Sequence, residues 1–190
     1  MQNSIENYNR KSIRLKGHDY STPGAYFITV VTKDRICLFG NIENGGMRLN
    51  ALGMIVREEW FKTTMLRPYV HLYEDEFVIM PNYVHGIIWL IDDELVGVRR
   101  RRTPTEEQYG KPVVGSIPTI LRAFKSSVTY RAGRELSITK IWQRNYYEHI
   151  IRDQNNLENI TKYILSNPYN WENDAENQTN PSVRSKRKDH

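Results

Sequence analysis

The sequence predicts an α+β domain: a ferredoxin-like antiparallel sheet with helices packed mainly on one face. Two observations lead to this fold class. Segments rich in β-branched and aromatic residues are joined by turn sequences, Asn44-Gly45-Gly46 and Pro81-Asn82, that favour hairpins. Two later segments, after Asn50 and Ser116, have apolar residues at three- and four-residue spacing, which marks helices with one buried face.

The first half of the chain alternates sheet and helix. The predicted elements are a strand (25–32), a hairpin (36–40 with 47–49), a helix that begins after Asn50, and a central hairpin (70–80 with 84–91). Asn50 is a good helix cap, and Leu52, Ile55 and Trp60 form the apolar face of the helix that follows. This face must lie on the sheet.

The second half of the chain is predicted to contain most of the helices. The predicted elements are a mobile basic loop (92–114), a helix from Ser116, a short strand (140–142), a helical segment (145–152) and a final helix (155–166). A polar, Asn-rich tail is predicted to be mostly disordered over 172–190. The chain is therefore expected to form one domain over 21–171, preceded by a basic segment at 1–20.

Composition excludes several classes of protein. The 190 residues suit one domain, and they contain no membrane-length apolar run and no signal-peptide pattern after Met1. We therefore expect a soluble cytoplasmic protein. The single cysteine, Cys37, excludes an internal disulfide and a thiolate zinc cluster. A metal ion would have nitrogen and oxygen ligands, which suit Mg²⁺ or Mn²⁺.

The net charge of +5 and the pI near 9.3 arise from unevenly placed cations. Clusters of Lys and Arg attract phosphate backbones without reading the base sequence, although they also occur in tails that only keep a protein soluble. We expect nucleic acid to be the partner. The candidate DNA-binding residues are Arg14, Lys16, Arg99, Arg100, Arg101, Arg102, Arg122, Lys125 and Arg144.

Two pairs of residues could carry chemistry. Tyr83 and His85 are alternate residues of a predicted strand, so they share one face and both could approach a metal ion. Tyr163 and Asn167 are four residues apart on the final helix, which brings a phenol and an amide oxygen together. A tyrosine can act as a covalent nucleophile, and attack on phosphorus needs a nearby metal ion. The alternative is that all four residues only pack or end an element.

Three segments in order resemble the REP-associated tyrosine transposases, which are single-tyrosine HUH transposases. The segments are FVIMPNYVHGII at 77–88, WQRNYYEHIIR at 142–152 and YILSNP at 163–168. The opening, SIRLKG at 12–17 and PGAYF at 23–27, is similar to the family's first strand and its approach. The resemblance covers residues 9–172, and the three motifs together are more specific than any one of them.

The resemblance implies a DNA strand transferase with a ferredoxin-like sheet. Tyr163 would attack a phosphodiester to form a 5′-phosphotyrosine bond and leave a free 3′-hydroxyl, and the reaction could later reverse. His85 would be the second histidine of the metal motif, and Asn167 the third ligand of Mg²⁺ or Mn²⁺. The substrate would be single-stranded or hairpin DNA from repetitive palindromes. A monomer and a homodimer are both open.

The chain departs from the family at Tyr83, where the motif has a histidine. A neutral phenol is a poor ligand, because its pKa near 10 must fall before it can bind a metal as phenolate. Three outcomes are open: His85, Asn167 and water hold the metal, Tyr83 binds as phenolate, or cleavage is weakened or lost. Besides a strand transferase, the sequence is compatible with a catalytically silent DNA-hairpin-binding protein or an RNA-binding protein without chemistry.

Overall fold

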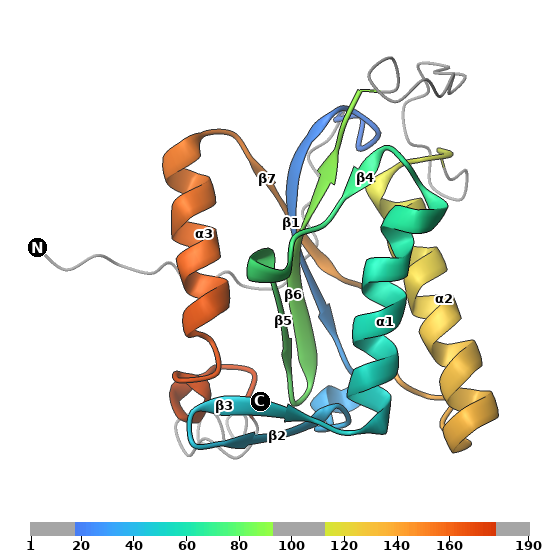
Figure 1. Ribbon diagram of the computed structural model, residues 1–190, viewed down its shortest axis with the longest axis vertical. Coiled ribbons are helices and arrows are strands. Elements are labelled where there is room, and N and C mark those ends of the chain that lie inside the picture. Colours follow the sequence, from blue (N-terminus) through green and yellow to red (C-terminus); the bar gives the residue numbers. More distant parts are fainter. Residues whose placement is uncertain (1–17, 93–112, 178–190) are drawn as a thin grey trace, which may run out of the picture.

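The sheet is the centre of the computed structural model, which describes residues 18–92 and 113–177 (Figure 1). Its strand order is β4-β6-β1-β7, and β5 also pairs with β6. All pairs are antiparallel. The strands are β1 (Gly24–Val31), β4 (Val70–His71), β5 (Phe77–Met80), β6 (Tyr83–Leu90) and β7 (Tyr147–Ile151). A separate hairpin contains β2 (Gly40–Glu43) and β3 (Gly46–Leu49). The structure confirms the α+β class and the antiparallel sheet.

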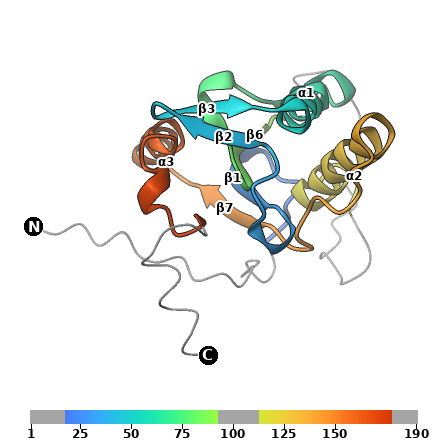
Figure 2. The same cartoon turned by 90° about the horizontal axis from the view of Figure 1, so that it is seen from below.

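Two helices cover one face of this sheet, as Figure 2 shows. They are α1 (Ala51–Leu66), capped by the Asn50 side chain, and α2 (Ile117–Leu136). Their apolar faces join alternate residues of β1 and β6, including Ile28 and Val84, in the main core. The predicted apolar faces of both helices are therefore confirmed.

The third helix, α3 (Gln154–Ser166), lies on the opposite face (Figure 2). Ile164 is fully buried there, and Leu157 and Ile160 are partly buried beside it. They pack with Phe27 of β1 and Ile87 of β6, which alternate with the residues of the main core. Because side chains alternate along a strand, Tyr83 and His85 also face α3. The helices that pack on the predicted common face of the sheet are therefore α1 and α2, while α3 covers the other face.

Several predicted boundaries are wrong. The segment 145–152, expected as a helix, contains β7, which pairs with β1 from Ala25↔Ile151 to Thr29↔Tyr147. A short apolar run does not distinguish helix from strand by itself, and an available partner at the sheet edge decides it. The strand expected over 70–80 is divided into β4 and β5 by the 3₁₀ turn η2 (Glu74–Glu76). The strand expected over 140–142 is reduced to a single bridge between Thr32 and Trp142.

The folded chain continues past the predicted start of the tail. The 3₁₀ turn η3 (Trp171–Asn173) follows α3, and Asn177 is 4% exposed, so 172–177 belongs to the folded domain. Its polar residues are held by hydrogen bonds, including one from the Asn177 side chain to the Trp171 carbonyl. The basic segment at 1–17, the loop at 93–112 and the tail at 178–190 lie outside the described residues.

Within the described ranges, 18–92 and 113–177, no helix has the length and apolar character that a membrane span requires.

Gly86 allows α1 to lie close against β6. A Cβ atom at Gly86 would be 2.5 Å from Cζ2 of Trp60, whose indole stacks on the Phe77 ring. We expect Gly86→Ala to lower the free energy of unfolding by about 1–3 kcal/mol, because the rigid indole must shift. Gly46→Ala is the control, since its Cβ would be 3.6 Å from the nearest atom. Urea unfolding checks both, and equal midpoints would contradict this account of the packing.

Candidate active site

The four residues singled out as candidates meet between β6 and α3. The Tyr163 hydroxyl lies 3.4 Å from Nε2 of His85. The rings of Tyr83 and His85 have centroids 4.5 Å apart. The Tyr83 hydroxyl donates to Oδ1 of Asn167 over 2.6 Å. Strand alternation and helical spacing account for each pair, and the packing of α3 against the sheet brings the two pairs into one cluster, as the resemblance implied.

Tyr163 has the exposure that a nucleophile needs. Its residue is 48% exposed, so a polymer can reach it, while the Phe27 ring contacts it edge-on. Loss of water around the hydroxyl raises the pKa of Tyr163, the Asp174 carboxyl raises it further, and the Asn167 side chain opposes this. The phenol therefore carries its proton at neutral pH and has to lose it during attack.

His85 is fixed in position by β1. Its Nδ1 lies 2.8 Å from the Thr29 hydroxyl, and Thr29 is its direct partner in the β1–β6 pairing. Burial lowers the pKa of His85 to about 3, although a hydrogen bond with the Ile28 backbone raises it in part. The imidazole is therefore neutral. If Nδ1 carries the hydrogen, the Nε2 lone pair is directed to the Tyr163 side and is available to a metal ion or a proton.

Asn167 keeps its place although Pro168 follows it. Its backbone stays helical, with φ −55° and ψ −47°, and its Nδ2 donates to the Tyr163 carbonyl over 2.9 Å. Oδ1 is therefore the atom turned toward Tyr83. The predicted proximity of Asn167 to Tyr163 is confirmed, and the side chain has a defined orientation.

Asp174 is a site residue that the sequence analysis missed. The Tyr83 hydroxyl donates to its Oδ2, so one phenol hydrogen faces two oxygen acceptors. Burial raises the pKa of Tyr83, and the charge of Asp174 raises it further, so the phenol keeps its hydrogen in this arrangement. Asp174 was assigned to the tail, and only its acidity next to the apolar Trp171 could have indicated that it returns to the sheet.

The donors fit a small hard cation. His85 supplies a neutral nitrogen, and Asn167 and Asp174 supply an amide and a carboxylate oxygen that converge on one hydroxyl. Mg²⁺ and Mn²⁺ accept such a set. Among the residues that the structure describes, no group of three or more His, Cys, Asp or Glu is placed to hold a metal ion, so a metal site here would include the amide. Tyr83 would have to release Asn167 for this to happen.

The basic candidates are only partly described. Lys125 and Arg144 lie together, because Nζ of Lys125 donates to the carbonyl oxygens of Gln143 and Arg144. Arg122 is exposed on α2, three residues before Lys125. Arg14, Lys16 and Arg99, Arg100, Arg101 and Arg102 lie outside the described residues.

Comparison with known proteins gives one sequence relative at high identity. No family model matches the chain. A Haemophilus influenzae protein described only as uncharacterized is 43% identical over 171 residues, which is 88% of this chain and 92% of that protein. The two chains belong to one family.

Two further comparisons concern transposases. A second Haemophilus influenzae protein, provisionally described as a REP-associated tyrosine transposase, is 28% identical over 155 residues, covering 79% of this chain and 73% of that protein. A REP-associated tyrosine transposase solved bound to a REP hairpin matches with a TM-score of 0.51 and 22% identity, over 86% of this chain and 73% of that one. The chain has the fold of that transposase. In sequence it is similar to the provisionally described transposase of Haemophilus influenzae.

Proposed function

We propose that this protein cleaves and rejoins single-stranded DNA through a 5′-phosphotyrosine at Tyr163, with palindromic hairpin DNA as substrate. One observation carries the proposal: the hydroxyl of a partly exposed tyrosine lies 3.4 Å from a neutral histidine nitrogen. The relatives support the substrate class, because one is described as REP-associated and the other is bound to a REP hairpin.

The reaction needs a nucleophile, an acceptor for its proton and a leaving group. The Tyr163 hydroxyl gives up its proton as its oxygen forms a bond to phosphorus, the bond from phosphorus to the 3′ oxygen breaks, and the 3′ oxygen takes up a proton, so that no net proton is consumed. The same steps in reverse rejoin the DNA, so the reaction needs no water and no external energy source. Phe27 and Asn167 hold Tyr163 at the site, and Thr29 orients His85.

His85 and Asn167 would hold a divalent ion, Mg²⁺ or Mn²⁺, and Asp174 is a further oxygen donor beside them. When bound, the ion would polarise a phosphate oxygen and hold the ester in line for attack. The chain thus supplies a buried, neutral imidazole and an oriented amide as ligands, and an accessible phenol as the nucleophile.

A second function is favoured by the contact between Tyr83 and Asn167. The Tyr83 hydroxyl occupies the amide oxygen that a metal would need, and Asp174 also accepts from this hydroxyl. A protein locked in this state would bind hairpin DNA without cleaving it. It would behave as a DNA-hairpin-binding protein derived from a transposase.

Labelled hairpin oligonucleotides distinguish these functions. We expect a protein–DNA adduct that survives denaturant in Mn²⁺ and is lost in EDTA. The adduct should carry a 3′ label, and the released fragment should carry the 5′ label and a 3′-hydroxyl that a polymerase can extend. Adducts that carry the 5′ label would contradict the proposed polarity. Binding without any adduct, at every metal concentration, would contradict cleavage and leave the second function.

A further inference from the structure

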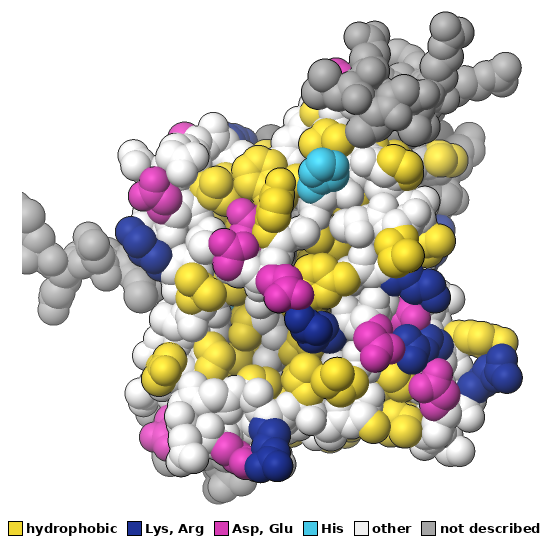
Figure 3. Space-filling model, viewed as in Figure 1, with side chains coloured by type: hydrophobic (Ala, Val, Ile, Leu, Met, Phe, Trp, Pro, Cys, Tyr) yellow, Lys and Arg dark blue, Asp and Glu magenta, His cyan; other side chains and the backbone are white. Residues whose placement is uncertain are grey.

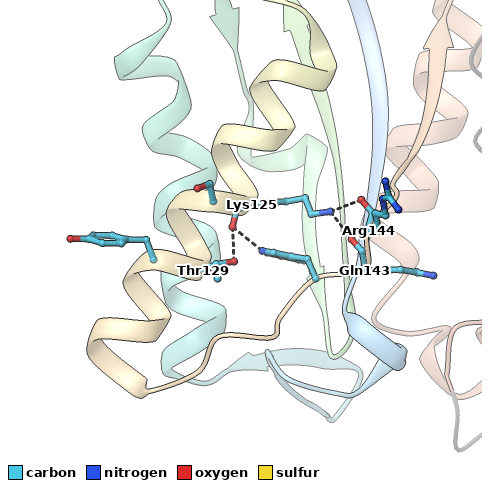
Figure 4. Close-up of a pocket in the computed structure, with 7 residues that line it drawn as sticks. Lys125, Thr129, Gln143 and Arg144 are labelled. Carbon is cyan, nitrogen blue, oxygen red and sulfur yellow. Dashed lines mark hydrogen bonds between the residues drawn. The ribbon is translucent and has the colours of Figure 1, made fainter. Parts of the chain in front are cut away.

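A shallow hollow lies between α2 and the segment that leads into β7. Its volume is about 510 Å³, and Figure 4 shows Lys125 and Thr129 on the helix opposite Gln143 and Arg144. Tyr130 and Trp142 add aromatic rings to the lining, which contains cations, hydroxyls and an amide but no carboxylate among its residues. Such a lining suits an anion attached to a planar ring.

Lys125 joins the two sides of this hollow, and its ammonium group can still donate a hydrogen bond to a ligand. Its Nζ donates to the Gln143 carbonyl over 2.6 Å and to the Arg144 carbonyl over 3.1 Å, as the dashed lines of Figure 4 show. An ammonium group has three hydrogens, so one remains for a ligand. Partial burial lowers the pKa of Lys125 to about 8, because the charged amine loses water. A phosphate at this point would stabilise the charged form.

The cations of the hollow differ from the described cations that pair with carboxylates elsewhere on the fold. Arg48, Arg57 and Arg131 each pair with carboxylates. Among the described residues drawn in Figure 3, Lys and Arg side chains are likewise interspersed with Asp and Glu. Lys125 and Arg144 form no ion pair within the part of the chain that the structure describes. Their charge is thus available to a bound anion.

The hollow lies at the same end of the sheet as the candidate active site. The backbone N–H of Gln143 donates to the Val31 carbonyl, and Val31 pairs with Tyr83 on the other side of β1. Neighbouring strands are about 4.8 Å apart, so Gln143 and Tyr83 are separated by roughly two strand spacings. The hollow is on the α2 side and Tyr163 is on the α3 side, so a strand of DNA would connect them around the end of the sheet.

We propose that this hollow binds a nucleotide of the single-stranded DNA that flanks the cleavage point, with its phosphate at Lys125 and Arg144 and its base against Tyr130. Tyr130 is 64% exposed, and Arg134 donates to its hydroxyl over 3.3 Å, so the ring is accessible for stacking. Base stacking on an aromatic ring does not depend on sequence. The inference rests on the proposed function, because it extends that substrate beyond the scissile phosphate.

The test measures binding, not cleavage, so that the two proposals can fail separately. The full-length chain carries Tyr163→Phe, and fluorescence anisotropy compares a hairpin with single-stranded flanks against the same hairpin without them. Tyr130→Ala and Arg144→Ala should each weaken binding of the flanked hairpin by roughly tenfold. Both should leave the unflanked hairpin unchanged. Tyr130→Phe keeps the ring and should bind as the parent does.

Lys125→Met tests the phosphate contact, with Lys62→Met as the matched control because Lys62 is half exposed on α1 beside Glu59. We expect a loss for the flanked hairpin in the first and none in the second. Lys125 also joins two segments of the fold, so the surface variants at 130 and 144 decide the matter if Lys125→Met does not fold. Equal losses on both hairpins, no loss on either, or tighter binding of an RNA flank would overturn the proposal.

Discussion

Replacing Tyr163 with phenylalanine is expected to abolish both cleavage and the covalent adduct, with a loss on the order of 10³-fold or more. The substitution removes only the hydroxyl that lies 3.4 Å from His85. The ring keeps its edge-on contact with Phe27, so the fold and hairpin binding should remain. Gel assays for cleavage and adduct, with anisotropy for binding, check this.

Tyr169 provides the matched control for this substitution. It follows α3 and is 79% exposed, so it is the other tyrosine of this segment that DNA could reach. Tyr169→Phe should cleave as the parent does. Cleavage that survives Tyr163→Phe and disappears in Tyr169→Phe would identify Tyr169 as the nucleophile and contradict the assignment of Tyr163.

Replacing Tyr83 with histidine is expected to raise Mn²⁺ affinity by about tenfold or more and to increase the rate of adduct formation. In the parent protein the hydroxyl hydrogen of Tyr83 bonds to Asn167 and Asp174, and the raised pKa of Tyr83 keeps that hydrogen in place. An imidazole would supply a lone pair and release the Asn167 oxygen. Titration with Mn²⁺, followed by electron paramagnetic resonance, measures the affinity without relying on activity.

Tyr83→Phe separates the two effects of that change. It releases Asn167 but adds no ligand, and it leaves the Asp174 carboxylate without its phenol donor. We therefore expect a smaller gain in Mn²⁺ affinity than in Tyr83→His. If Tyr83→His binds Mn²⁺ no better than the parent, the departure from the family motif does not cost a ligand.

The sequence was sufficient for the parts of the site that depend on local periodicity. Alternation along β6 placed Tyr83 and His85 on one face, and the helical spacing placed Tyr163 beside Asn167. Both depend on neighbours in the chain, which the sequence shows directly. The apolar faces of α1 and α2 were predictable for the same reason.

The parts that depend on distant pairing were not predictable. β7 forms because the edge of β1 is available, and its residues alone were compatible with a helix. Asp174 reaches the site because the chain turns back after α3. The polar composition of this segment had instead indicated a mostly disordered tail. The hollow at Lys125 likewise needs α2 and Gln143 to meet, although they are separated in sequence.

The most direct test of the central claim is to identify the amino acid that is bonded to DNA. Protein incubated with hairpin DNA and Mn²⁺ is digested with nuclease and protease, and the linked peptide is sequenced by mass spectrometry. The account predicts a 5′-nucleotide on the Tyr163 oxygen. A nucleotide on another residue, or cleaved DNA with no linked peptide, would contradict it.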